Sequence, residues 1–335
     1  MAPIADVCRF VRCKSENGFA ILVVIAAVGL LALAAALFSR VTSSQVKASA
    51  VAVETARARA LAAAGINLAV LKLLDFRANP SGKHRRFAIG GEAFACRLDN
   101  NLISTEAHDE GGKVDLNFAG ERLLRALVHG LDVEGARADT LVDAILDYRD
   151  VDNIKRPKGA EDDEYRAAGR AQGPKNAPFA AVEELDQVLG FDAELLARMT
   201  PFVTAHSGKD GVDPVVAPRR LIEILRRGDT PMPASDTGLE VAFDDLGSDL
   251  PAYFNAPSTR NTFAVRSEVV MAGGVKFALE AIVDIALLRP GAPGTQRQAP
   301  VFHLWRWRQV PSVARDGVPG STAEALPECE LLPGT

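Results

Sequence analysis

The chain has 335 residues, 48% hydrophobic and 24% charged, which is enough for more than one folded core. This balance excludes a chain that is disordered throughout. The net charge of -5 argues against the basic surface that bulk nucleic-acid binding requires. The four cysteines contain no Cys-x-x-Cys pair, so neither a zinc ribbon nor a thioredoxin-type site is indicated.

The first predicted element is a long amino-terminal helix. The segment from Phe19 to Phe38 is apolar and uncharged, and at about 1.5 Å per residue it matches the roughly 30 Å hydrocarbon core of a bilayer. Between Ser39 and Phe76 there is no proline, and Gly65 is the only glycine, so the helix is expected to continue. Asn79-Pro80-Ser81-Gly82 should end it.

This apolar segment has several interpretations. A secretory signal peptide is disfavoured, because the apolar part of such a peptide is only about 7–15 residues long and ends at a cleavage site of small residues. Here the helical pattern continues beyond the apolar run. A lipoprotein is excluded because Cys8 and Cys13 precede the apolar run. A plain signal anchor stays open on this pattern alone.

Strands and helices follow in separate blocks. Alternation of apolar and polar residues predicts short strands near Phe87–Ile89, Ala93–Leu98 and Leu102–Ala107, with a turn at Gly111-Gly112. The period then changes, and four short helices are predicted within residues 117–205, in the segments AGERLLRALVHGL, ARADTLVDAILDYRD, AAVEELDQVLG and DAELLARMTPFV.

The remaining chain predicts an internal repeat and three more strands. VDLNFAGERLLRAL at 114–127 matches VDPVVAPRRLIEIL at 212–225, which indicates either a duplicated strand-to-helix element or chance similarity. Two alternating runs joined at Gly273-Gly274 predict a hairpin, and VFHLWRWRQV predicts a further strand. Trp305 and Trp307 are expected to share one strand face and to pack in the sheet.

The clearest chemistry lies in an acidic loop at residues 143–179. Asp143, Asp147 and Asp150 recur on one helical face, where like charges at this spacing and at a helix carboxyl end are unfavourable. Carboxylates continue across the loop at Asp152, Glu161, Asp162 and Asp163. A hard cation such as calcium would explain this pattern, although the spacing is not that of an EF-hand. Surface pairing with Arg149, Lys155, Arg156 and Lys158 is the alternative.

The start of the apolar helix resembles the leader junction of type IV pilins and type II secretion pseudopilins. SENG followed by FAILVV has a short charged leader, then Gly18 before the expected cleavage and Phe19 as the first mature residue. Most such proteins carry Glu as the fifth mature residue, whose carboxylate neutralises a neighbour's amino terminus within lipid. Here that position is Val23, which suits a subunit with no neighbour ahead of it.

Taken together, the motifs resemble general secretion pathway protein K, the K-type minor pseudopilin of type II secretion systems. The residues that carry the resemblance are Gly18 before a helix without the usual Glu, and the ordered segments DLNFA, DYRDVD, GAEDDEY, KNAPF and VEELDQVLG. The resemblance implies calcium bound by the acidic loop, with the ligands among Asp147, Asp150, Asp152, Glu161, Asp162 and Asn176.

The resemblance also implies the fold class, which is α+β: a pilin-like long amino-terminal helix packed on a small antiparallel sheet, with an inserted α-helical domain. The expected organisation is a prepilin-type leader at 1–18, the long helix at 19–78 with 19–38 crossing the membrane, a pilin-like α/β domain at 79–115 and 208–309, the inserted domain with its acidic loop at 116–207, and a flexible tail at 310–335.

The expected function is that of a non-enzymatic minor pseudopilin at the tip of a periplasmic pseudopilus, where it helps to start assembly for the export of folded proteins. Expected partners are the I-type and J-type minor pseudopilins, the major pseudopilin, the prepilin peptidase and the inner-membrane secretion platform. The chain should be cut after Gly18, methylated at Phe19, and held in the bacterial inner membrane by one span with its carboxyl-terminal domain in the periplasm. There Cys96 and Cys329 can form a disulfide that tethers the tail.

Other functions were weighed against this one. A minor type IV pilin shares the leader and the helix. A helix-hairpin-helix protein of DNA uptake is disfavoured because Gly190 stands among acidic rather than basic residues. No G-x-S-x-G motif indicates an enzyme, and no metal-ligand spacing connects the histidines, which are His84, His108, His129, His206 and His303.

Overall fold

The computed structural model describes residues 17–78, 81–229, 251–286, 301–312 and 329. The chain divides into two compact units, residues 1–57 and 58–335. Most of the expected leader and most of the expected tail lie outside the described residues.

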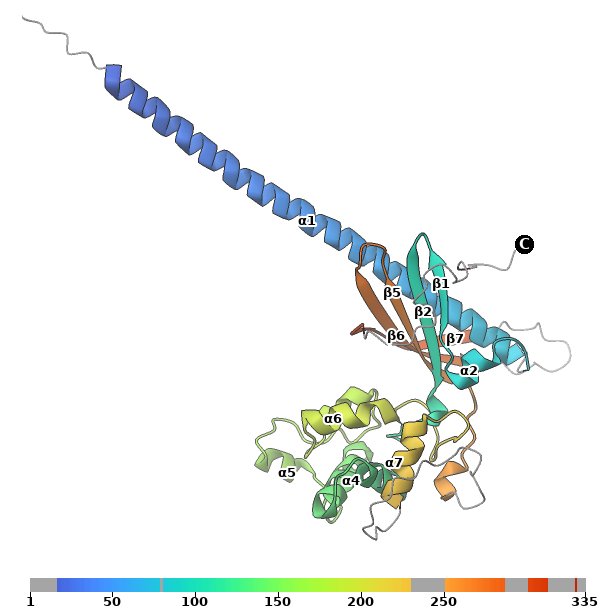
Figure 1. Ribbon diagram of the computed structural model, residues 1–335. Coiled ribbons are helices and arrows are strands. Elements are labelled where there is room, and N and C mark those ends of the chain that lie inside the picture. The colour runs from blue at the N-terminus through green and yellow to red at the C-terminus, as the bar shows by residue number, and fades with distance from the viewer. Residues whose placement is uncertain (1–16, 79–80, 230–250, 287–300, 313–328, 330–335) are drawn as a thin grey trace, which may run out of the picture. The chain divides into compact units, whose positions relative to one another are not determined.

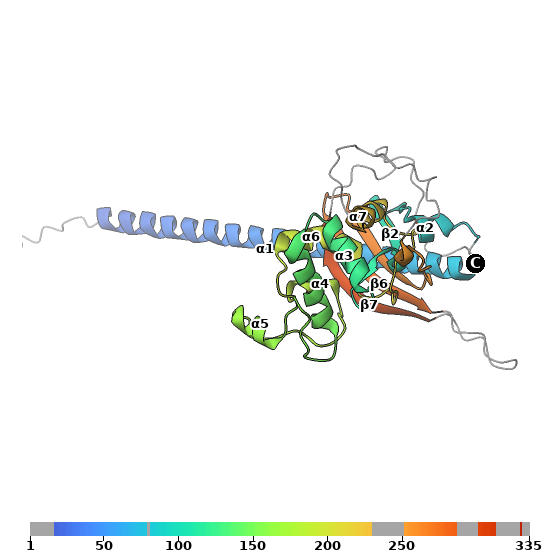
Figure 2. The ribbon, with the colours of Figure 1, turned by 90° about the horizontal axis from the view of Figure 1, so that it is seen from below.

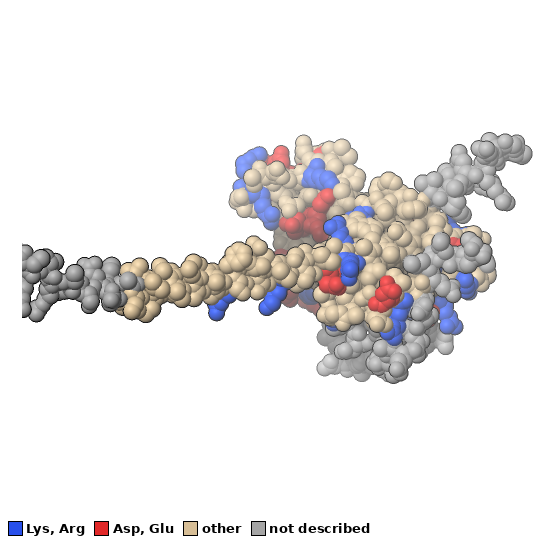
Figure 3. Space-filling model, turned by 90° about the horizontal axis from the view of Figure 1, so that it is seen from above, with Lys and Arg blue, Asp and Glu red and all other residues tan. Residues whose placement is uncertain are grey.

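The long amino-terminal helix is confirmed. Helix α1 runs from Asn17 to Ala78, over 62 residues (Figure 1). Its part from Ile21 onward has a stretch with mean hydropathy 3.0, none of it buried, which is long and apolar enough to cross a membrane. Figure 3 shows an uncharged surface along this amino-terminal part. Gly18 and Phe19 lie in the first turn of α1, so their expected cleavage stays a prediction.

A five-stranded antiparallel sheet follows in the second unit. Its strands are β1 (Phe94–Leu98), β2 (Asn101–Asp109), β5 (Thr262–Val270), β6 (Lys276–Ala286) and β7 (Val301–Val310), in the order β1-β2-β5-β6-β7. Central strands β2 and β5 pair although about 150 residues separate them, with Asp109 opposite Phe263. We call the segment between them, residues 110–261, the helical body. The predicted combination of long helix, antiparallel sheet and additional helices is therefore confirmed.

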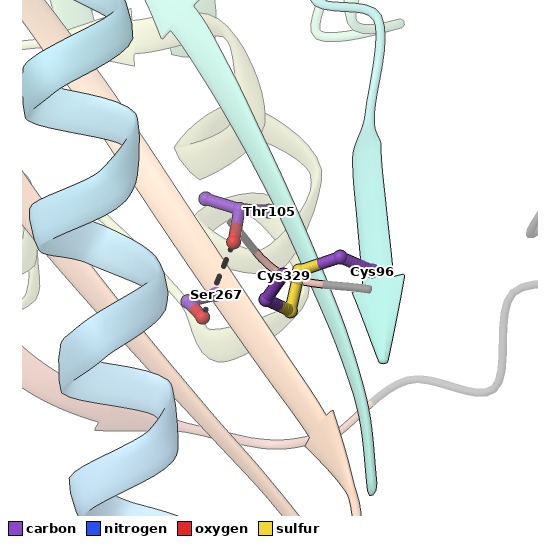
Figure 4. Close-up of a disulfide and its surroundings, with 4 residues drawn as sticks. All are labelled: Cys96, Thr105, Ser267 and Cys329. Carbon is purple, nitrogen blue, oxygen red and sulfur yellow. Dashed lines mark hydrogen bonds between the residues drawn. A yellow bond between two sulfur atoms is a disulfide. The ribbon is translucent and has the colours of Figure 1, made fainter. Parts of the chain in front are cut away.

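The carboxyl-terminal part of α1 packs on this sheet through one apolar stripe. The buried residues recur at helical spacing, and three of the seven are alanines, which let the helix lie close to the strands; they are Ala58, Ala62, Ile66, Ala69, Val70, Leu73 and Phe76. Gly65 lies directly over two strands, where Thr105 Oγ1 and Ser267 Oγ are 3.4 Å apart and buried (Figure 4). A Cβ at this position would overlap the Ser267 hydroxyl and lie 2.9 Å from Thr105 Oγ1.

Replacing Gly65 with leucine should therefore lift α1 from the sheet. The expected loss is about 1–3 kcal/mol of unfolding free energy, typical of overpacking a tight core. Thermal unfolding of the full chain in detergent measures it. Ala60→Leu on the exposed side of the same helix is the control and should change stability by less than about 0.5 kcal/mol. Equal stability of the two variants would contradict this packing.

Cys96 and Cys329, whose pairing the sequence left open, form a disulfide with Cα atoms 4.9 Å apart (Figure 4). Cys96 is fully buried in β1, and the backbone N–H of Cys329 donates to the carbonyl of Arg97 at 2.9 Å. The bond joins residues 233 positions apart and fixes Cys329 at the β1 edge of the sheet.

The helical body has a core of its own. Its helices are α3 (Glu121–Gly130), α4 (Gly135–Arg149), α5 (Asp162–Ala167), α6 (Ala193–Met199) and α7 (Arg219–Asp229), with a short parallel pair of β3 (Val114–Asp115) and β4 (Val203–Thr204). In Figures 1 and 2, α3, α4 and α7 form one group and α5 lies at its rim. The fully buried side chains that hold the group together include Leu124, Leu127, Ile145, Leu185 and Leu225.

The predicted repeat is a real structural duplication. The Asp115 carboxylate accepts from the backbone N–H of Asn117 at 2.8 Å, and its carbonyl accepts from Ala119 N at 2.8 Å. Asp213 repeats both contacts with Val215 N at 2.9 Å and Ala217 N at 3.0 Å. In each copy a helix begins six residues after the aspartate. The structure assigns a strand only to the first copy, so the duplicated element is a turn and a helix.

The two helices of the repeat, α3 and α7, pack against each other through equivalent glycines. Gly130 lies against the carbonyl of Ile224, and Gly228 lies against the carbonyl of Ala126. Gly130 and Gly228 are each 15 positions after their aspartates, so the contact is symmetric. A side chain at either glycine would overlap the partner's backbone.

The ends of the helical body are held together where it leaves and rejoins the sheet. The Ser258 hydroxyl donates to the carboxylate of Asp109 at 2.7 and 2.8 Å, and the Ser258 N–H donates to Asp213 Oδ2 at 2.8 Å. Arg77, in the last turn of α1, donates to the carbonyl of Thr259 at 3.0 Å. The body therefore joins the sheet beside the carboxyl-terminal end of α1.

Three predictions were wrong. Phe87–Ile89 lies in a short helix, α2 (Arg85–Gly90), rather than in a strand. AAVEELDQVLG forms only a 3₁₀ turn, η2 (Val182–Asp186). Trp305 and Trp307 are 56% and 37% exposed rather than packed in the sheet. The register of β6 and β7 shifts at Ile282/Val283, which leaves Trp305 without an opposite residue on β6.

Candidate metal centre

The acidic face of α4 is compensated by backbone amides of the following loop. Asp143 Oδ2 accepts from Lys158 N at 3.0 Å, and the two oxygens of Asp147 accept from Arg156 N at 3.3 and 3.2 Å. Gly159 lies against the Asp147 carboxylate so closely that a side chain there would overlap it. Burial raises the pKa of Asp147 to about 6 despite these bonds.

Glu161 is the least compensated carboxylate of the loop. Its side chain is 6% exposed, and neither Oε1 nor Oε2 has a hydrogen-bond partner. Burial, together with the charges of four neighbouring carboxylates, raises its pKa to about 7; these neighbours are Asp147, Asp150, Asp152 and Asp162. The structure therefore brings all five predicted acidic residues into one electrostatic cluster centred on Glu161.

Two more buried oxygens of the predicted set lack donors. Asp150 ends α4, and its Oδ1 is buried without a partner. Asn176, with a left-handed φ of 50°, donates from Nδ2 to Asn153 Oδ1 at 2.6 Å, which leaves its own buried Oδ1 unpaired. An unsatisfied buried oxygen costs about 1–3 kcal/mol, so these oxygens are available to a partner, either a hydrogen-bond donor or a cation.

The neighbouring cations do not supply that partner. Lys155 binds Glu164 and Lys158 binds Asp139, each at 2.5 Å. Arg149 donates to the carbonyls of Leu116 and Ala119 instead of to a carboxylate. Arg156 Nε lies 3.7 Å from Asp147 Oδ1. None of these four cations forms an ion pair with Glu161 or Asp150 among the described residues, although the charges of Arg156 and Arg149 partly offset the rise in the pKa of Asp150.

The donor set fits a hard cation in its chemistry. Glu161, Asp150 and Asn176 offer carboxylate and amide oxygens, which calcium prefers. Within the described ranges, no three side chains of His, Cys, Asp or Glu are close enough together to bind a metal ion by themselves. An amide oxygen such as that of Asn176 would therefore have to contribute. Asp147 is already bonded to the loop, and Asp152 and Asp162 are exposed at its edge. Asp152 Oδ1 accepts from Ile154 N at 2.8 Å.

The sequence patterns missed two contributors to this site. The amides of Arg156 and Lys158 carry no sequence signal, because any residue type supplies a backbone N–H. Asn153, which orients Asn176, stands in the segment DVDN and could have been selected as a neutral oxygen donor beside Asp152.

Part of the chain is similar to one family of known proteins. The family model described as Type II secretion system (T2SS), protein K matches residues 100–208. Type II secretion system protein K of Pectobacterium carotovorum subsp. carotovorum is 31% identical over 105 residues, 31% of this chain and 32% of that protein. The protein of the same name from Klebsiella pneumoniae is 27% identical over 208 residues, 57% of this chain and 63% of that protein. Each match thus spans less than two thirds of the relative.

A solved structure has the same fold. It is described as the GspK-GspI-GspJ complex from the enterotoxigenic Escherichia coli Type 2 Secretion System. The likeness covers 77% of this chain and 98% of that chain, with a TM-score of 0.59 and 21% sequence identity.

Proposed function

We propose that the chain is a minor pseudopilin at the tip of a periplasmic pseudopilus, a role supported by the match of residues 100–208 to the family model of type II secretion system protein K. Its role is then to bind other subunits and a membrane. The observation that supports the tip position is the place where the helical body is attached to the sheet, beside the carboxyl end of α1.

Arg77, near the carboxyl end of α1, contacts Thr259 just before β5, so the helical body leaves the sheet at the end of α1 opposite to its apolar segment. In a filament whose subunits insert their apolar helix ends into the membrane, this end points away from the membrane. A bulky body at this end of the helix would hinder the addition of a further subunit, which is the role of a cap.

The proposed attachment to the membrane rests on the amino-terminal part of α1. Residues 19–38 form the span, prepilin peptidase cleaves after Gly18, and Phe19 becomes the methylated first residue. Val23 replaces the usual Glu, as expected for a subunit that neutralises no neighbour ahead of it. The main body then lies in the periplasm, where the disulfide is stable.

The proposed partners are the I-type and J-type minor pseudopilins, because the protein of like fold was solved in a complex with GspI and GspJ. The major pseudopilin would extend the filament below them, on the inner-membrane secretion platform.

Calcium is proposed as the resident ion of the acidic loop. Glu161 and Asp150 would hold it with Asn176, whose unpaired oxygens support this choice. The ion would neutralise the cluster and fix the loop on α4.

Immunogold labelling of pseudopili tests the tip position. Cells lacking this chain would receive a tagged copy while the major pseudopilin is overproduced. The expected result is label at one filament end, together with co-purification of the I-type and J-type subunits from detergent. Label along the filament, or a chain that purifies without either subunit, would contradict the proposal.

A further inference from the structure

The helical body contains a pocket of about 560 Å³ beside the acidic loop. Tyr148 from α4 and Tyr165 from α5 line it together with the loop 170–175 and Gln187. None of the proposed calcium ligands lines it. Its mouth is open to solvent, because Arg170 and Gln172 are exposed.

The pocket presents hydrogen-bond donors without partners. Tyr148 is only 5% exposed, and no hydrogen bond joins its hydroxyl to another residue within the described part of the chain. Tyr165 is 2% exposed, and its hydroxyl oxygen accepts from Leu189 N at 3.1 Å, which leaves its proton free to donate. The Arg170 guanidinium has neither an ion pair nor a hydrogen bond among the described residues.

The carboxylates beside Lys175 and Gln187 are already engaged. Lys175 holds the Glu184 carboxylate at 2.8 and 3.1 Å, and Gln187 donates to Asp186 at 2.7 Å. The pocket therefore has an excess of donors and one uncompensated positive charge on Arg170. Its ligand must supply acceptor oxygens and a negative charge.

The wall of the pocket also suits a polypeptide. The backbone N–H groups of Ala171, Gln172 and Gly173 have no partner among the described residues, so this bend at the rim of the pocket can donate to the main chain of a partner. We propose that the pocket binds an aspartate or glutamate side chain on an extended segment of a partner protein, with Tyr148, Tyr165 and Arg170 holding the carboxylate. This goes beyond the proposed function, because it assigns a contact that neither membrane attachment nor calcium binding requires.

Fluorine NMR of the full chain in detergent, with calcium present, tests this site. The chain has three tyrosines, so labelling with 3-fluorotyrosine gives two reporters in the pocket and one, Tyr253, buried elsewhere. Single Tyr→Phe variants assign the signals. The probe is the tripeptide acetyl-Ala-Glu-Ala-amide, and the comparisons are the same peptide with Gln and inorganic phosphate.

The glutamate peptide should shift the Tyr148 and Tyr165 signals saturably and leave Tyr253 unchanged. Arg170→Gln should weaken binding by about tenfold, as expected for loss of a charge-assisted bond. Arg166→Gln is the control, because Arg166 pairs with Asp163 and does not line the pocket. Equal shifts with the glutamine peptide or with phosphate, no shift at all, or full binding by Arg170→Gln would overturn the proposal.

Discussion

Replacing Gly228 with valine is expected to unfold the helical body. The added side chain would overlap the carbonyl of Ala126, and a backbone atom in the middle of helix α3 cannot move aside as a flexible side chain can. The expected cost is about 3 kcal/mol or more, at the upper end of overpacking effects. Gly130→Val should cost a similar amount, because Gly130 occupies the equivalent place against Ile224.

Chemical denaturation of the full chain in detergent, followed by the far-ultraviolet circular dichroism signal, measures both variants. Gly273→Ala is the control, because a Cβ at Gly273 meets no atom within 4 Å, and it should change stability by less than about 0.5 kcal/mol. A Gly228→Val chain as stable as the control would contradict the close approach of α3 and α7.

Calcium is expected to raise the thermal stability of the chain, and the rise should depend on Asp150 and Glu161. An ion that binds only the folded state stabilises it by about 2.7 kcal/mol at 100 times its dissociation constant, a shift of roughly 5–10 °C in a domain of this size. The double variant Asp150→Asn and Glu161→Gln should lose this response. Scanning calorimetry with calcium and with a chelator measures it.

The same double variant also distinguishes two roles for Asp150 and Glu161, namely binding an ion and stabilising the fold directly. Without calcium it should be as stable as the unchanged chain or more so, because each amide removes a carboxylate charge that burial and its neighbours disfavour. Asp163→Asn, whose partner is the exposed Arg166, should keep the full response. Equal melting temperatures with calcium and chelator in the unchanged chain would end the calcium proposal.

The elements that the sequence predicted best are those with long, regular patterns. Helix α1 was predictable because no proline interrupts it and its apolar positions keep helical spacing up to Phe76. The repeat was predictable because Asp115 and Asp213 each fix a local turn before a helix, which local sequence alone determines. Apolar and polar residues alternate clearly in strands β2, β5 and β6, so the strands could be predicted. Their order in the sheet could not, because it depends on pairing between distant segments.

Each wrong prediction also has a specific physical cause. Six residues of α2 are too few to separate helical from strand periodicity. The displacement of Trp305 follows from a bulge in the β6–β7 pairing, which depends on register rather than on the strand's own sequence. Helix α5 had a readable signal, since Asp162, Asp163 and Glu164 occupy its first turn, yet the prediction treated the segment only as an acidic loop.

The candidate site was predicted as a set of residues but not as an arrangement. All five predicted carboxylates act on one another, as DYRDVD and GAEDDEY suggested. The sequence could not predict which carboxylates are hydrogen-bonded and which are not. In the structure Asp147 accepts from Arg156 N, whereas both oxygens of Glu161 stay unpaired. That difference arises from how the loop backbone folds over α4.

The most direct test of the proposed pseudopilin role is to determine the amino terminus of the protein isolated from membranes. Intact mass and amino-terminal sequence should be determined in cells with and without active prepilin peptidase. The expected result is a chain that starts at methylated Phe19 only when the peptidase is active. A chain that keeps its leader, or one cut elsewhere in both cell types, would make residues 19–38 an ordinary anchor or signal and would contradict the proposed place in a pseudopilus.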